Sequence, residues 1–344
     1  MQWLLPIRRR TYEGADGFGR LLADSEADAK YVSLVPITST AELLIHPTAF
    51  KTVAGYRFNV AACRQISSLV CGGLPTVLFS LLPNTPSPTP EAELGLLRIY
   101  NQAVKLAGAN AVGFKLVVDK RGGHVVGVVG RTYKFVSNAE VLRLAARYFK
   151  QAQPGYVLMK AELNNRELSL LASRRGASVN SDGVSFKQGL ALYKSETTKR
   201  AIFAPQVLFD SLTKSYSYEP ESSANRMIHR RKKQFAVQLE SLVTAAFQAG
   251  SFLETAANRH QELVKMPLSP VDKREAALHS ISRRLLSRKL NALPVERVIA
   301  SLGRIREPTR WDVYRSMVAV AGEFRSTERQ LRMAAFRFLY KGEL

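Results

Sequence analysis

Residues Phe114–Lys150, FKLVVDKRGGHVVGVVGRTYKFVSNAEVLRLAARYFK, decide the fold class that this chain is expected to adopt. Apolar and polar residues alternate on both sides of a Lys-Arg-Gly-Gly turn, and this pattern predicts a β-hairpin. Ser137 follows the hairpin with Glu140 three residues later, a spacing that predicts a capping box at the start of a helix. The residues that recur at helical spacing after it, and that we expect to pack against the sheet, are Val141, Leu144, Ala145 and Tyr148.

Further strands and helices are predicted on both sides of this stretch from the same two periodicities. The predicted strands are Tyr31–Ile37, Tyr156–Ala161, Glu167–Ala172 and Val184–Tyr193, with a turn at Ser181-Asp182-Gly183 and a further apolar segment at Ala201–Phe209. Other segments are predicted as helices. The first has the apolar face Val60, Cys63, Ile66 and Val70, the second covers Glu91–Ala107, and the third has the apolar stripe Phe235, Leu239, Leu242, Val243 and Ala246. The fourth covers Ser269–Leu290, the fifth starts at Thr309 with Asp312 three residues later, and Ser326 caps a last helix to about Lys341.

These elements predict an α+β fold in which a mostly antiparallel sheet with a β-hairpin carries packed helices, followed by a helical C-terminal region. We expect three regions along the chain. Residues 1–110 form a mixed or helical region with a proline-rich linker at 83–90, residues 111–220 a β-rich core, and residues 221–344 a basic helical region.

The charge of the chain points to a polyanionic partner. Its 344 residues include 50 Lys and Arg against 28 Asp and Glu, a net charge of +22. A charge this far from zero opposes compaction through self-repulsion, so a polyanion that neutralises it is the natural explanation. Nucleic acid is the first candidate, because neutralised phosphates release counterions and this release favours binding. An anionic membrane surface and a generally basic cellular neighbourhood are the alternatives.

Cysteine content and hydropathy predict a cytoplasmic protein without a membrane partner. Cys63 and Cys71 form no metal-ligand spacing and no disulfide framework, so we expect buried free thiols in a reducing compartment. The chain has no apolar run of about 18 residues, which a membrane span would need. At the start, MQWLLPIRRR places its apolar residues before its charges, the reverse of a secretory signal.

Catalytic motifs are not found in the sequence. There is no nucleophile elbow, HExxH sequence, paired-cysteine metal site or Walker loop. Gly122 and Gly123 belong to the predicted hairpin turn and not to a strand-to-helix turn, which argues against a dinucleotide site. The five histidines are scattered. We therefore expect a non-enzymatic protein that uses no cofactor, metal or ATP, although an unrecognised catalytic pocket stays open as an alternative.

Basic residues interleaved with aromatics are the chemistry that remains. The densest run is Arg226–Lys233, RMIHRRKK, with five Lys and Arg and one histidine. It lies at the start of a predicted helix, where positive charge is unfavourable to the helix dipole, so a binding role is favoured over a merely solvated face. The aromatics at 133–135 fit core packing as well as base stacking. The predicted nucleic-acid-binding residues are Arg131, Tyr133, Lys134, Lys194, Lys199, Arg200, Arg226, His229, Arg230, Arg231, Lys232 and Lys233.

Three stretches of the chain resemble the phage/plasmid-like protein family, an uncharacterised domain of phage and plasmid genomes. Asn59–Leu82 is similar to that family's apolar helix with Arg-Gln and a Gly-x-Pro step, and His124–Tyr148 resembles its Val-rich strand and helix. Gly183–Lys233 resembles its later strand and Arg-x-x-His step, with Lys194-Ser195-Glu196 at the family's Asn-Ser-Glu position. The family's Cys-Asn-Gly motif is absent here, and Phe209–Leu212 stands in its place.

The resemblance implies a protein of a phage or mobile element that works in the bacterial cytoplasm. Its hairpin-and-helix core is also similar to that of single-strand annealing proteins of the RecT/Red-beta type, which is an analogy of fold and charge. The similarity to annealing proteins implies single-stranded DNA as the partner, with assembly into a ring or filament.

Three functions fit these observations. The first is a protein that binds single-stranded DNA and promotes annealing and recombination without ATP. The second is an architectural or regulatory protein that binds duplex DNA, and the third is a structural or assembly protein of a phage particle or compartment. In the first of these, residues 114–150 build a groove and Arg226–Lys233 supply much of its charge.

Overall fold

The computed structural model describes most of the chain. The described residues are 9–47, 51–52, 54–58, 60–69, 90–107, 112–133, 135–151, 155–164, 167–195, 202–213, 215–220, 222, 224–227, 234–270, 273–287, 290–324 and 328–341.

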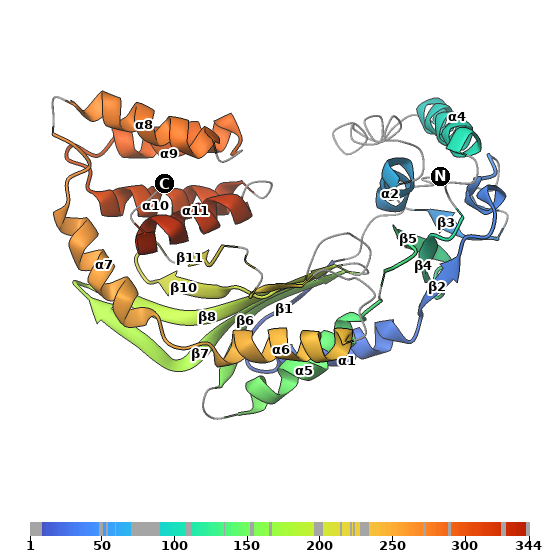
Figure 1. Ribbon diagram of the computed structural model, residues 1–344, viewed down its shortest axis with the longest axis horizontal. Coiled ribbons are helices and arrows are strands. Elements are labelled where there is room, and N and C mark those ends of the chain that lie inside the picture. The colour runs from blue at the N-terminus through green and yellow to red at the C-terminus, as the bar shows by residue number, and fades with distance from the viewer. Residues whose placement is uncertain are drawn as a thin grey trace.

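The fold is α+β, as predicted, and contains two separate sheets (Figure 1). The eight-stranded large sheet is antiparallel, and β6, β7, β8 and β10 follow one another across its centre. Its strands are β1 (Arg9–Tyr12), β6 (Tyr156–Asn164), β7 (Glu167–Ser181), β8 (Val184–Ser195), β10 (Gln206–Asp210) and β11 (Ser215–Tyr218), with the two-residue strands β9 (Ile202–Phe203) and β12 (Arg226–Met227) attached beside β8.

The predicted strands after residue 155 are confirmed, and they extend further than expected. The Ser181-Asp182-Gly183 turn is also confirmed: Asp182 has a φ of 44° and Gly183 a φ of 79°, the left-handed conformations that a tight hairpin needs. The sequence does not predict β1, because Arg9 and Arg10 resemble a solvated basic run and the strand has only four residues.

The predicted hairpin at 114–129 forms, but it belongs to the other sheet. β4 (Lys115–Asp119) and β5 (His124–Val129) pair antiparallel, with β2 (Val32–Pro36) beside β4 and β3 (Arg57–Phe58) parallel to β5. Both faces of the hairpin are apolar. One buries Leu116, Val118, Val125 and Val128 beneath α2 (Val60–Leu69) and α4 (Pro90–Ala107), and the other packs Val117, Val126 and Val129 against Tyr133 and Phe135.

The expectation that residues 114–150 form one unit is therefore corrected. The helix after the hairpin, α5 (Asn138–Lys150), has the predicted Ser137–Glu140 capping box, but Val141, Ala145 and Tyr148 pack into the core of the large sheet. α5 does not pack on the hairpin because other residues already pack against both of the hairpin's faces. The stretch thus joins the two sheets, with the hairpin in one and α5 on the other.

One face of the large sheet is covered by α1 (Gly17–Ala29), α5 and α6 (Phe235–Gln248), which lie together in Figure 1. The stripe predicted for α6 is confirmed, since all five of its residues are buried. The sequence does not predict α1, because GFGRLLADSEADA buries only a narrow face. The core beneath these helices combines residues from Tyr12 to Phe247.

Five helices that follow α6 in the chain form another core, which includes Val184 and Phe186 of β8 and Leu208 of β10. α10 (Arg310–Glu323) is buried along most of its length, and its predicted start at Thr309 has a capping box with Asp312. The helix expected from Ser269 begins only at Arg274, and the predicted cap Ser326 lies outside the described residues. These helices are α7 (Leu253–Lys265), α8 (Arg274–Ser287), α9 (Ala292–Gly303), α10 (Arg310–Glu323) and α11 (Glu328–Lys341).

Of the two cysteines, Cys63 is buried, as expected. Cys71 and the proline-rich linker before Pro90 lie outside the described residues.

Candidate nucleic-acid interface

Four of the predicted binding residues fall within the described structure, and it does not bring them to one place. These are Arg131, Tyr133, Lys194 and Arg226. The predicted residues outside the described part of the chain are Lys134, Lys199, Arg200, His229, Arg230, Arg231, Lys232 and Lys233.

Arg131 and Tyr133 lie between the two sheets. Arg131 is exposed, and its side chain covers Gly113, where a Cβ atom would lie 2.7 Å from the Arg131 Nε. Tyr133 packs against the second face of the hairpin, and its hydroxyl donates a hydrogen bond to the Ser195 carbonyl oxygen at 3.4 Å. Tyr133 therefore works as a packing residue between the sheets.

Lys194 does not lie on the surface. Its side chain is only 3% exposed, and its Nζ donates a hydrogen bond to Asn138 Oδ1 at 2.9 Å, at the first residue of α5. The alternation of β8 explains this position, because Lys194 points the same way as Leu190 and Leu192, into the core beneath α5. A surface phosphate contact by Lys194 does not fit this burial.

Arg226 is exposed and begins the basic run Arg226–Lys233 on the strand β12. It lies directly opposite Phe203 of β9, and Phe203 in turn lies opposite Tyr193 of β8. Because paired residues share one face of a sheet, Arg226 stands on the same face as these two rings. The described chain resumes at Gln234, immediately before α6, so the basic run precedes that helix and does not occupy its first turn.

The face that carries Arg226 is the one opposite α1, α5 and α6, and we call it the open face. Part of it lies beneath α11, whose Met333 packs against its buried residues. Its apolar residues include Leu171 and Ala191, whereas the neighbouring Leu170 and Leu192 point into the covered core. The open face also carries five aromatic rings, which we call the aromatic cluster. They are Tyr193, Phe203, Phe209, Tyr216 and Tyr218.

The five rings of the aromatic cluster form a continuous chain across β8, β9, β10 and β11. The centroid distance is 5.9 Å from Phe209 to Tyr216, 6.1 Å from Tyr216 to Tyr218, and 6.1 Å from Tyr218 to both Tyr193 and Phe203. Phe203 and Tyr218 are buried, whereas Tyr193, Phe209 and Tyr216 are half-buried. The sequence does not predict this cluster as a site, although the alternation in Ser215–Tyr218, SYSY, was a signal for two tyrosines on one face of a strand.

Two arginines of α11 lie over these rings. The guanidinium carbon of Arg329 is 4.3 Å from the centroid of Phe203 and 5.9 Å from that of Tyr193. The guanidinium carbon of Arg332 is 3.7 Å from the centroid of Tyr216, and its nitrogens donate to Ser215 Oγ and to the Tyr216 carbonyl oxygen. These cation–π contacts fix α11 against the edge of the sheet. Arg332 also forms a 3.0 Å ion pair with Glu328, whose carboxylate accepts a hydrogen bond from the Tyr216 hydroxyl.

Gly189 leaves room for the Phe209 ring. A Cβ atom at this position would lie 2.5 Å from Phe209 Cε2 and 2.2 Å from the Ala172 carbonyl oxygen. Because glycine has no side chain, the Phe209 ring can lie against the backbone of β8.

The tyrosines of the cluster stay uncharged phenols at neutral pH. Burial is the largest cause that raises the pKa values of Tyr193, Tyr216 and Tyr218 above 10, and it acts against the Arg332 charge that lowers the pKa of Tyr216. Groups with raised pKa values of this kind are poor general bases near neutrality. The cluster can therefore offer ring faces and neutral hydroxyls, and this chemistry suits binding.

Exposed cations flank the aromatic cluster on the open face. Lys160 lies opposite Leu171, Lys187 opposite Phe209, and Arg226 opposite Phe203. Lys160 also forms a 3.1 Å ion pair with Glu162. The open face thus combines separated cations with half-buried rings, the two features that single-strand binding uses.

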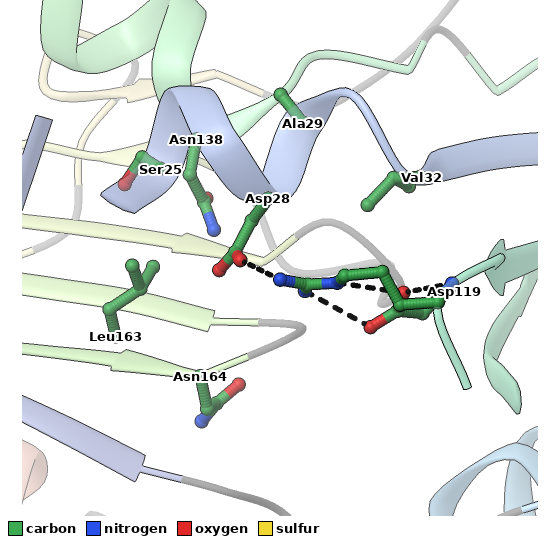
Figure 2. A pocket seen from close by; sticks show the side chains of 9 residues that line it. Ser25, Asp28, Ala29, Val32, Asp119, Asn138, Leu163 and Asn164 are labelled. Atoms are coloured by element: carbon green, nitrogen blue, oxygen red, sulfur yellow. Dashed lines mark hydrogen bonds and ion pairs between the residues drawn. The ribbon is translucent and has the colours of Figure 1, made fainter. Parts of the chain in front are cut away.

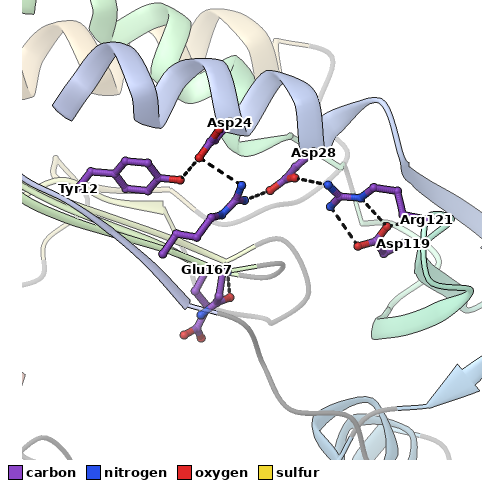
Figure 3. Close-up of polar contacts among 8 residues, drawn as sticks. Tyr12, Asp24, Asp28, Asp119, Arg121 and Glu167 are labelled. Atoms are coloured by element: carbon purple, nitrogen blue, oxygen red, sulfur yellow. Dashed lines mark hydrogen bonds and ion pairs between the residues drawn. The ribbon is translucent and has the colours of Figure 1, made fainter. Parts of the chain in front are cut away.

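A second polar site lies where the two sheets meet, and Figure 3 shows its ion pairs. Asp28, near the end of α1, pairs with Arg10 of β1 and, at 2.7 Å, with Arg121 of the hairpin turn. Arg10 also contacts Asp24 at 3.3 Å, and Arg121 contacts Asp119 at 3.3 Å. We call these residues the junction network.

A small pocket opens beside the junction network (Figure 2). Its lining includes Ser25, Asp28, Asn138 and Asn164, and it leaves about 20 Å³ for the centre of a water molecule. That space holds about one water, so a nucleotide or an organic cofactor does not fit. The junction therefore serves to join the two sheets.

No family model, curated protein or solved structure matches this chain. Among the described residues, no group of three or more His, Cys, Asp or Glu side chains is arranged to hold a metal ion. No described helix combines the length and apolar character needed to cross a membrane.

Proposed function

We propose that this protein is a non-enzymatic nucleic-acid-binding protein that holds single-stranded DNA and promotes annealing without ATP. The observation that carries the proposal is the open face of the large sheet, where exposed cations surround half-buried aromatic rings. The net charge of +22 supports it, because binding to phosphates relieves the self-repulsion of the chain.

In this proposal the phosphates lie along Lys160, Lys187 and Arg226, and the basic run Arg226–Lys233 adds further contacts. Cations that neutralise two strands reduce the repulsion between their backbones. Complementary strands can then approach closely enough to pair, and the free energy of base pairing drives the reaction. No ATP is needed for such a step.

The experiment that tests the proposal changes Arg230, Arg231, Lys232 and Lys233 together to Glu. We expect binding to a single strand to disappear in a fluorescence-anisotropy titration, because four attractive charges become repulsive. At low salt, where residual binding can still be measured, we expect the slope of log affinity against log salt to be shallower by about three, since each phosphate that a cation neutralises contributes roughly 0.7 to that slope.

The matched control reverses four exposed cations elsewhere, Arg283, Arg284, Arg297 and Arg304, with the same change of net charge. This variant should keep most of the single-strand affinity. Wild-type affinity in the Arg230–Lys233 variant, or equal reductions of affinity in both variants, would contradict binding through the basic run.

Competition between single-stranded and duplex DNA at one salt concentration separates the possible partners. Preference for the duplex would replace our proposal with an architectural or regulatory function. Large assemblies without affinity for nucleic acid, seen by light scattering, would instead indicate a structural or assembly protein of a phage particle or compartment.

We also propose that the protein forms a ring or filament of identical copies and acts in the bacterial cytoplasm. The resemblance to phage and plasmid proteins, and to single-strand annealing proteins, supports this part. Mass photometry with and without single-stranded DNA tests it, and a monomer under both conditions would contradict it.

A further inference from the structure

We infer that the aromatic cluster is a stacking surface for unpaired bases, with Phe209 and Tyr193 as the rings that bases contact. The inference rests on the proposed function, because it assigns the bases of the same strand whose phosphates bind the cations of the open face. It adds a source of affinity that charge alone does not provide.

The position of the rings supports this inference. Phe203 and Tyr218 are almost fully buried and form the base of the cluster, whereas Tyr193 and Phe209 keep part of their surface exposed. Antiparallel pairing of β8, β9, β10 and β11 fixes all five rings on one face, with neighbouring centroids 5.9–6.1 Å apart. When a base stacks on a ring that is already rigid and half-buried, the ring loses little conformational entropy.

The charges around the cluster fit an unpaired strand. Lys187 lies opposite Phe209, Arg226 opposite Phe203, and the Arg329 guanidinium stands over Phe203. These rings therefore have cations beside them, as a strand with one phosphate per base requires. The raised pKa values of Tyr193, Tyr216 and Tyr218 keep the phenols neutral, so they do not repel phosphate.

An unpaired strand suits this surface better than a duplex does. Bases within a duplex are already stacked on each other, so their faces are not available to protein rings. Every base has an aromatic face, so stacking here would be tolerant of sequence. This is the behaviour expected of a protein that anneals many different strands.

The first test compares wild-type binding to two strands of equal length and equal phosphate number. One is oligothymidine, and the other is an abasic strand with the same backbone. We expect the abasic strand to bind roughly tenfold or more weakly, because stacking contributes substantially for each base. Equal affinity for both strands would overturn the inference and leave the proposed function standing. If neither strand binds, the proposed function itself fails.

The second test assigns the effect to the aromatic cluster. Phe209→Leu keeps an apolar side chain over Gly189 but removes the aromatic face. It should reduce affinity for oligothymidine roughly fivefold or more and leave affinity for the abasic strand unchanged. The matched control is Phe252→Leu, a half-buried ring that packs edge-on against Phe336 and Tyr340 elsewhere in the fold.

The two variants separate base stacking from a general disruption of the fold. Equal reductions of affinity for Phe209→Leu and Phe252→Leu, or equal reductions on both strands, would overturn the assignment. Thermal unfolding of both variants shows whether each remains folded at the temperature of the titration.

Discussion

Gly189 illustrates how one residue shapes the open face. It lies in the middle of β8, where a neighbouring carbonyl oxygen and the Phe209 ring leave no room for a side chain. The backbone conformation of β8 is ordinary for a strand, so the requirement for glycine is one of space. Sequence alone reveals a glycine inside a strand, but the ring that lies against it comes from a different strand.

Gly189→Ala should destabilise the protein by about 1–3 kcal/mol, because a rigid backbone oxygen and a packed ring must both move. The free energy of unfolding in urea measures this decrease. Gly19→Ala in α1 is the control, since beyond its chain neighbours and the nearby backbone of its own helix nothing lies within 4 Å of the added Cβ, and we expect it to be neutral or to stabilise by about 0.5–1 kcal/mol. An unchanged urea midpoint for Gly189→Ala would contradict the steric argument.

At the scale of elements, buried polar contacts with Ser181 hold α7 to the β7–β8 hairpin, and one of them is the hydrogen bond from the Ser181 hydroxyl to the Ala257 carbonyl oxygen at 3.2 Å. His260 of α7 places its Nδ1 3.0 Å from the Ser181 hydroxyl oxygen. Its ring packs edge-on against the Trp311 ring, with 4.4 Å between the two ring centroids. Burial lowers the pKa of His260 below 6.5 and outweighs the opposite effect of Asp182 and Asp210. The neutral ring is therefore the form that stabilises the docking of α7.

This pKa shift predicts a pH-dependent stability. As the pH falls below about 6.5, the unfolded chain binds a proton that the folded chain binds less readily, so the free energy of unfolding decreases. The decrease from this group is at most about 1.4 kcal/mol per pH unit. Urea titrations between about pH 5 and 8 should show a weaker dependence in His260→Gln. His279→Gln, an exposed control on α8, should retain the wild-type dependence, and identical profiles for all three proteins would refute this role.

For the whole molecule, the junction network is the ionic connection between the two sheets. Asp28 lies near the C-terminal end of α1, where a carboxylate is unfavourable to the helix dipole, and two guanidinium groups from different sheets compensate. The Tyr133–Ser195 hydrogen bond adds to the connection. These polar contacts fix the relative position of the two sheets.

Asp28→Asn should loosen this connection without unfolding either sheet, because the pair with Arg121 is partly exposed and contributes modestly, about 1 kcal/mol or less. Spin labels at Leu106→Cys on α4 and Leu293→Cys on α9, two exposed positions, would report the distance between these two helices. Both labelled proteins would also carry Cys71→Ser. We expect a broader distribution of label distances than in the protein with Asp28 intact. Glu26→Gln is the control, because its partner Arg143 lies on the same side of the junction, and equal widths for both variants would argue against the role of Asp28.

Local patterns in the sequence determined many elements of this protein. The Ser137–Glu140 capping box, the helix start at Thr309, the hairpin at 115–129 and the apolar stripe of α6 depend on residues close together in the chain, and all are confirmed. Short-range hydrogen bonds and side-chain periodicity are sufficient to specify such features. The antiparallel α+β class follows from them.

Only the tertiary structure decided which sheet each element joins and what each face carries. The hairpin pairs with β2 and not with β6, and Lys194 points inward because β8 packs beneath α5. The aromatic cluster combines rings from four strands with arginines from α11, more than 100 residues from Tyr193. Contacts this distant depend on how faces are buried and on strand register, which local periodicity does not encode.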